Sequence, residues 1–99
     1  MFSHLDPKDP VIDGLEEHQI IFARNQSEFR KLPGIVSKQK DGAVLTRWRL
    51  APEDRAALAA GADVFVEILT MGFALQPLRV SVGEGDSTDA ATIRQEYGL

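Results

Sequence analysis

Apolar and polar residues alternate along several short stretches of this chain, which is the pattern of half-buried β-strands. The clearest case is residues 35–50, where two alternating runs flank Asp41-Gly42. Asp-Gly readily adopts the positive φ angles of a tight turn, so we predict a β-hairpin here. A strand alternates its side chains between two faces. One face of the second strand would carry Val44, Thr46, Trp48 and Leu50, and the other Leu45, Arg47 and Arg49.

Three further strands are predicted, over about residues 18–24, 64–71 and 78–82. The first two are apolar on both faces, which favours a central position in a sheet or a contact between subunits. The third alternates and should have one buried face. Gly72 permits a turn between the last two strands, so residues 68–82 are expected to form a hairpin with an unusually apolar tip.

Residues 51–61 carry the signals of one short helix. Pro52 suits the first helical position, Glu53 and Asp54 suit the positive end of the helix dipole, and Gly61 suits the C-terminal stop. The last residues, from Asp86 on, fit either a terminal helix or a tail. We therefore predict an α+β fold: a small, mostly antiparallel sheet of four to five strands, one short helix between strands, and a C-terminal helix as an open alternative.

The chain has the length of one domain, and its charge is unevenly distributed. Its net charge is −4, but residues 18–83 hold nine Lys or Arg against six Asp or Glu, so the middle is mildly basic and both ends are acidic. We expect an irregular acidic arm over 1–16, a single α+β domain over 17–83, and an acidic tail or short helix over 84–99.

Composition excludes several classes of site. The chain has no Cys, which rules out thiolate metal sites, disulfides and cysteine nucleophiles. Its apolar runs are far shorter than the roughly 18 residues of a membrane span, and its start does not resemble a signal peptide. We expect a cytoplasmic protein without cofactor, metal or membrane contact.

Catalytic groups are scarce. The chain has two His residues, His4 in the arm and His18 at a strand start, and surface positions explain both. Glu53 and Asp54 are explained by the helix dipole, and Glu67 by pairing with an Arg on a neighbouring strand. We therefore expect that the protein is not an enzyme.

Binding groups are easier to find. Arg47, Arg49 and Arg79 lie on predicted strands, and guanidinium groups suit bidentate recognition of phosphate. Trp48 fits either plain packing or stacking on a base. Because Trp48 and its flanking arginines point to opposite faces, one ligand would touch both only at a boundary between subunits. The side-chain amide of Gln76 could hold the turn together or form hydrogen bonds with a ligand. Duplex nucleic acid is not expected, because the positive charge is weak.

The tip of the predicted 68–82 hairpin suggests an interface. Met71, Phe73 and Leu75 are too apolar for a free loop, so we expect the arm, another subunit or a partner to cover them.

Residues 41–80 also follow a pattern: a Gly-x-Val strand, Trp-x-Leu, an acidic-Arg helix, Gly, Leu-Thr-x-Gly and Leu-Gln-Pro. The matching positions are Gly42, Val44, Trp48, Leu50, Asp54, Arg55, Gly61, Leu69, Thr70, Gly72, Leu75, Gln76 and Pro77. In this pattern the chain resembles a family of small proteins of tailed-phage and prophage genomes, from which it departs at Ala51 and Ala74. The family has no assigned activity, so the resemblance implies a phage accessory protein and no mechanism.

These observations lead to one leading hypothesis and a rival. The leading one is a non-enzymatic, homo-oligomeric phage-type protein in the host cytoplasm that sequesters a small anionic ligand, such as a cyclic nucleotide immune signal. The rival is a protein–protein interaction module that inhibits a host protein or serves as a minor structural or assembly factor. A third hypothesis is a small hydrolase of cyclic nucleotides that uses a carboxylate as its base.

Overall fold

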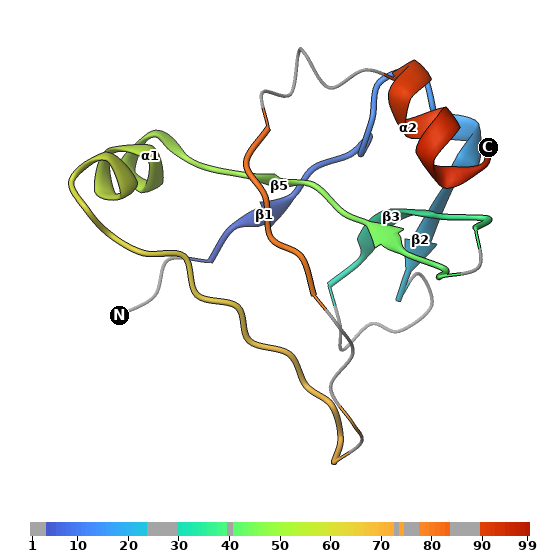
Figure 1. Ribbon diagram of the computed structural model, residues 1–99. Helices are drawn as coiled ribbons and strands as arrows, with labels where there is room; N and C mark the ends of the chain where they lie inside the picture. Colours follow the sequence, from blue (N-terminus) through green and yellow to red (C-terminus); the bar gives the residue numbers. More distant parts are fainter. Residues whose placement is uncertain (1–3, 24–29, 40, 73, 75–77, 84–89) are drawn as a thin grey trace.

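Five short strands, a 3-10 turn and two helices make up the described part of the chain. The computed structural model describes residues 4–23, 30–39, 41–72, 74, 78–83 and 90–99. The elements are β1 (Asp6–Pro7), η1 (Glu16–His18), β2 (Gln19–Phe22), β3 (Leu32–Val36), β4 (Val44–Leu45), β5 (Trp48–Arg49), α1 (Pro52–Ala59) and α2 (Ala90–Tyr97) (Figure 1). The predicted α+β class is confirmed. Of the two alternatives for the C-terminus, a helix or a tail, the structure has the helix, α2.

The strands form two separate antiparallel sheets where the sequence predicted one. A three-stranded sheet has the order β2-β3-β4, and a two-stranded sheet joins β1 to β5. Gly34 on β3 lies opposite Ile20, and a Cβ there would lie 2.8 Å from Cε2 of Phe22. Real Cβ atoms essentially never approach other atoms so closely, so a side chain at this position would force the Phe22 ring to move, and glycine leaves room for it.

The predicted hairpin over 35–50 is present in its first half. β3 pairs with β4, with Ile35 opposite Leu45. The Ser37 N–H donates to the Ala43 carbonyl at 2.7 Å, and Gly42 has the positive φ of 61° that the turn requires. The second strand then changes sheet, because residues 48–49 pair with β1 instead.

The core is built largely by the predicted N-terminal arm. The arm is irregular outside β1, but Val11, Ile12 and Leu15 are buried and pack with Ile35 of β3. Gln19 holds the arm in place: its Oε1 accepts from the Val11 N–H at 2.9 Å, and its Nε2 donates to Oδ1 of Asp9 at 2.9 Å. The charged arm therefore supplies most of the apolar residues that are buried in the core.

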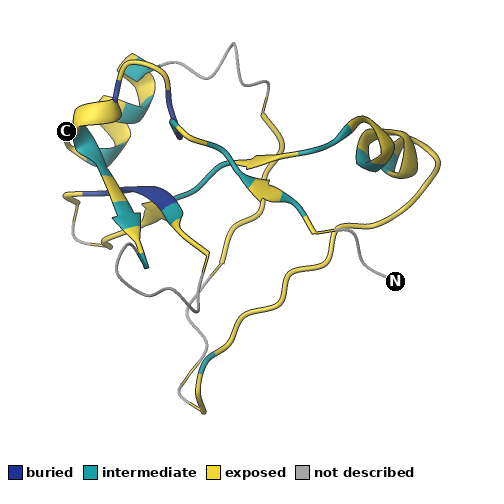
Figure 2. Ribbon diagram, turned by 180° about the vertical axis from the view of Figure 1, so that it is seen from behind, coloured by how far each residue is buried: buried dark blue, intermediate teal, exposed yellow. Residues whose placement is uncertain are grey.

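Helix α2 closes the core. Ala90, Ile93 and Tyr97 are half-buried against it, and their spacing places them along one side of the helix. The Tyr97 carbonyl accepts from the Lys38 N–H at 2.7 Å, which ties the C-terminus to the β3–β4 connection. Figure 2 shows the buried residues gathered beside α2, with α1 at a distance.

The predicted strands over 64–71 and 78–82 are wrong for the described residues. Residues 62–70 and 78–83 belong to no strand, so α1 is not followed by one in the part of the chain that the structure describes. The two stretches diverge instead of pairing (Figure 1). Alternation signals the capacity to form a strand, but a strand also needs a neighbour for its N–H and C=O groups. The tip residues Phe73, Leu75 and Gln76 lie outside the described residues.

Replacing Leu15 with Ala should lower the free energy of unfolding by about 2–5 kcal/mol, because Leu15 is fully buried in a small core. Urea denaturation followed by circular dichroism measures this. Asp13→Ala, at an exposed neighbouring position, is the control and should change stability by less than about 0.5 kcal/mol. Equal losses in the two variants would contradict the placement of the arm in the core.

Candidate functional site

Strand β5 carries Trp48 and Arg49, two of the predicted ligand-binding residues. The Trp48 side chain does not enter the buried core: the residue is 43% exposed, and its indole N–H donates to Oγ1 of Thr46 at 3.0 Å. This contact joins two residues that the alternation places on the same face. An indole that is partly exposed and oriented by one hydrogen bond presents a surface for stacking.

Arg47 has a structural role within the chain. Its Nη1 donates to the Val11 carbonyl at 3.3 Å, and its own carbonyl accepts from the Lys8 N–H at 2.7 Å. Both bonds fasten the arm to the segment that leads into β5. The residue as a whole is half-buried, and its contacts make Arg47 first a support for the core residue Val11.

Arg49 lines a hollow of about 520 Å³ between β5 and the start of α1. Arg55 lines it too, and its Nε donates to the Leu50 carbonyl at 3.3 Å. The remaining charged or titratable lining residues are His4, Asp6, Glu53 and Asp54. Two guanidiniums thus face three carboxylates, so one chain alone supplies no positive excess for an anion.

Of the other predicted site residues, the structure describes Arg79 and Met71 outside the lining of this hollow. Arg79 is exposed on the 78–83 stretch and is not among the residues that line it. Met71, from the predicted interface, is 73% exposed. Gln76, Phe73 and Leu75 fall outside the described residues.

The first turn of α1 is capped from inside the helix. Ala51 has no side-chain acceptor, but Oδ2 of Asp54 accepts from the Ala51 N–H at 3.2 Å. This is one of the two bonds of a capping box, and the second is missing because Ala51 lacks a hydroxyl. Asp54 is therefore engaged in the helix start, as its position in the sequence indicated.

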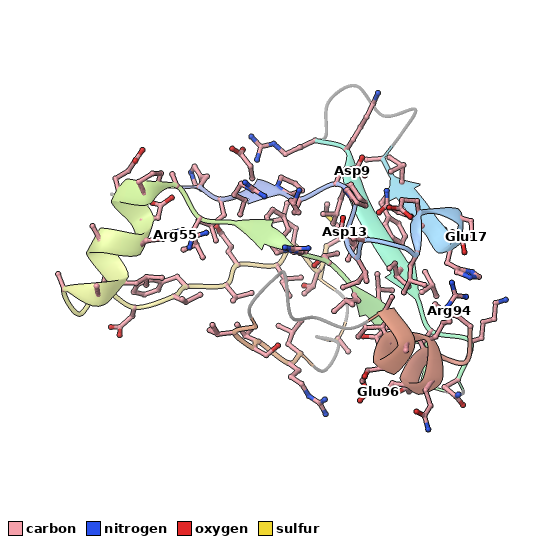
Figure 3. All side chains as sticks on the ribbon, turned by 90° about the horizontal axis from the view of Figure 1, so that it is seen from above. Asp9, Asp13, Glu17, Arg55, Arg94 and Glu96 are labelled. Atoms are coloured by element: carbon pink, nitrogen blue, oxygen red, sulfur yellow. The ribbon has the colours of Figure 1, made fainter. Side chains whose placement is uncertain are left out.

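A polar cluster that the sequence did not reveal joins η1 to α2. Nη2 of Arg94 lies 3.4 Å from Oε1 of Glu17, and Nη1 lies 3.4 Å from Nε2 of His18 (Figure 3). Arg94 also donates to the Gly14 carbonyl at 3.5 Å. The partners are more than 70 residues apart in the chain, so no local pattern could have found them. Gly14, Glu17 and Arg94 are exposed and His18 is half-buried, and these contacts, which we call the latch, hold α2 against η1.

The pKa of Glu17 lies below its ordinary value of 4.5. The main cause is a hydrogen bond from its own backbone N–H, followed, among the interactions that lower it, by the charges of His18 and Arg94. Burial raises the pKa of Tyr97, in keeping with the packing of its ring against the core.

A second hollow, of about 480 Å³, lies between the arm and β3. Arg30 and Lys31 line it together with Asp6 and Asp9, and Nη1 of Arg30 lies 3.2 Å from Oδ1 of Asp6. Within the described ranges, no group of three His, Asp or Glu is placed to hold a metal ion. Neither of the described helices has the length and apolar character needed to cross a membrane.

Comparison with known proteins finds one partial similarity. The chain is 32% identical over 84 residues to large ribosomal subunit protein uL3 of Azoarcus sp. (strain BH72). The aligned region covers 81% of this chain but 40% of the length of that protein. No protein-family model matches the chain, and no solved structure matches it.

Glu17→Gln should weaken the latch and remove part of the pH dependence of stability. Because the folded pKa of Glu17 is depressed, its contribution is present above the unfolded value of 4.5 and is lost as the pH falls through the folded value. Wild type should therefore be more stable than Glu17→Gln near neutral pH, and the difference should shrink at an acidic pH well below 4.5. Urea denaturation at the two pH values measures the difference. A gap that is unchanged at the acidic pH would rule out this role.

Ala51→Ser should complete the capping box and stabilise the first turn of α1 by about 1 kcal/mol. The added hydroxyl can accept from the Asp54 N–H, while Asp54 keeps its bond to the N–H of residue 51. Amide hydrogen exchange in residues 53–55 measures this locally and should slow in the variant. Asp54→Ala, which removes the existing bond, should accelerate the same exchange, and no change in either variant would refute the cap.

Proposed function

We propose that this chain is a non-enzymatic accessory protein that works by binding and does so as a homo-oligomer. The observation that carries the proposal is the exposure of its apolar side chains after α1. Leu69 is 71% exposed, Met71 73% and Val82 100%. Exposed apolar surface on this scale is characteristic of an interaction surface, and another copy of the chain can cover it.

The described polar groups support binding over catalysis. His18, Glu17 and Arg94 are engaged with one another at the exposed junction of η1 and α2. Asp54 is engaged in the cap of α1. A general base or nucleophile works in a hollow that excludes water, and neither cluster lies in such an enclosed place.

For the ligand, we propose a small anionic molecule such as a cyclic nucleotide. The support is the hollow that Arg49 and Arg55 line between β5 and the start of α1, together with the partly exposed indole of Trp48, which lies on the same strand but does not line the hollow. The carboxylates in the same hollow balance the charge of the arginines within one chain. A second copy that added a guanidinium, from Arg79 for instance, would tip the balance towards an anion. The setting that we propose is a phage or prophage genome, with the protein countering an immune signal in the host cytoplasm.

Native mass spectrometry with a panel of cyclic nucleotides tests the ligand. Wild type should retain one of them at micromolar concentration, and Arg55→Gln should weaken retention about tenfold through loss of a charge-assisted hydrogen bond. Lys38→Gln, an exposed position away from the hollow, is the matched control and should retain the ligand. The same spectra report the oligomer mass. A wild-type oligomer that retains no nucleotide would exclude this ligand while leaving the assembly intact.

The second candidate function is an interaction module for another protein, favoured by the exposure of Met71. It would explain the apolar surface without any ligand. A partner recovered from host lysate by wild type and by Arg55→Gln, but lost with Met71→Asp, would favour it. Recovery that is unaffected by Met71→Asp would count against it.

Similarity to a protein of the large ribosomal subunit raises a ribosomal role, which we do not propose. Binding to RNA phosphates depends on clustered Lys and Arg, and this chain has a net charge of −4. The described hollows also combine arginines with carboxylates.

A further inference from the structure

The chain exposes far more surface than its mass requires. Its accessible surface is 8202 Å², whereas a compact monomer of 10.9 kDa exposes about 5,600 Å². Its radius of gyration is 14.7 Å, against about 13 Å for a compact domain of this length. The excess area of roughly 2,600 Å² is about three times the 800 Å² or so that each partner buries in a standard interface.

One apolar segment of the chain is exposed along most of its length. Residues 62–72, which we call the limb, leave α1 and run away from both sheets, with a turn at Met71 and Gly72 (Figures 1 and 2). Val64 is 57% exposed, Val66 54% and Leu69 71%. The limb is rich in β-branched and other apolar residues, contains no proline, and belongs to no strand in the described part of the chain.

A receiving edge is present on β5. This strand pairs with β1 through two residue pairs, Asp6 with Arg49 and Pro7 with Trp48. A two-stranded sheet of that size is marginal by itself and gains from a third strand. Within the described residues, the other edge of β5 has no neighbouring strand.

The charges of the two segments are complementary. Asp63 and Glu67 are the charged residues of the limb, and both are acidic. Arg47 and Arg49 are the charged residues of the 46–50 stretch, and both are basic. Arg47 is committed to the Val11 carbonyl, so Arg49 is the guanidinium that remains exposed at this edge. Oppositely charged residues on neighbouring strands attract each other and help to set the register.

We propose that the limb of one copy adds as a strand to the free edge of β5 in a second copy, with Glu67 facing Arg49. The inference rests on the proposed homo-oligomer and specifies how it is built. In a two-fold dimer each copy gives its limb and receives that of its partner, so the contact forms twice. Strand addition of this kind forms main-chain hydrogen bonds between the two copies and buries apolar side chains in the same step.

Disulfide trapping tests the geometry directly, because the chain has no cysteine of its own. Glu67→Cys and Arg49→Cys chains of different tag length are co-expressed and oxidised mildly. Cα atoms on adjacent strands lie about 4.5–5.5 Å apart, within the range of a disulfide, so a mixed disulfide should form. Glu96→Cys, on the exposed side of α2, should form none with Arg49→Cys. A disulfide within single chains of the Glu67→Cys/Arg49→Cys double variant, in place of one between copies, would overturn the proposal.

Charge reversal gives an independent readout by sedimentation. Glu67→Arg and Arg49→Glu should each weaken dimerisation about tenfold or more, and the double variant should recover because the pair is restored with its signs exchanged. Glu96→Arg is the matched control and should sediment as wild type. A wild type that is monomeric at high concentration refutes both the oligomer and the limb contact. A wild-type oligomer that all of these variants leave unchanged refutes the limb contact alone.

Discussion

The burial of the N-terminal arm against β3 is the contact on which the described fold depends. Val11, Ile12 and Leu15 pack with Ile35, and α2 covers them from the other end of the chain. Polar contacts then fix this arrangement: Gln19 and Arg47 bond to the Val11 backbone, and Arg94 joins α2 to Glu17. Residues from the two ends and the middle of the sequence thus meet in one small core. Such contacts between distant residues have a high entropic cost, which the burial of a few large apolar side chains must offset.

So small a core leaves the rest of the chain with little to pack against. The limb, the 78–83 stretch and α1 are exposed almost throughout, although the limb is one of the most apolar parts of the sequence. The second copy that we propose would resolve this conflict between composition and exposure, because it would offer both apolar cover and backbone partners. On this view the oligomer completes the fold, and its stability and its binding function would depend on the same contact.

The hollow beside β5 has no excess of positive charge within one chain. Arg49 and Arg55 lie there with Asp6, Glu53 and Asp54, so the charges nearly cancel. The exposed indole of Trp48 adds a stacking surface at the same strand. The strand that we propose to receive the limb is thus the strand that carries the candidate ligand residues. Assembly would therefore change the electrostatics of the hollow as well as its walls.

The sequence by itself determined the local structure: the α+β class, the Asp41-Gly42 turn between β3 and β4, the start of α1 at Pro52 and the place of Asp54 in its first turn. Each depends on neighbouring residues, through turn chemistry, dipoles and capping. Only the tertiary structure decided that the acidic arm supplies the core, that Arg47 supports Val11, and that Arg94 latches α2. It also overturned the strands at 64–71 and 78–82. Alternation measures a capacity for pairing, whereas a strand exists only where the rest of the molecule, or another copy of it, supplies a neighbour.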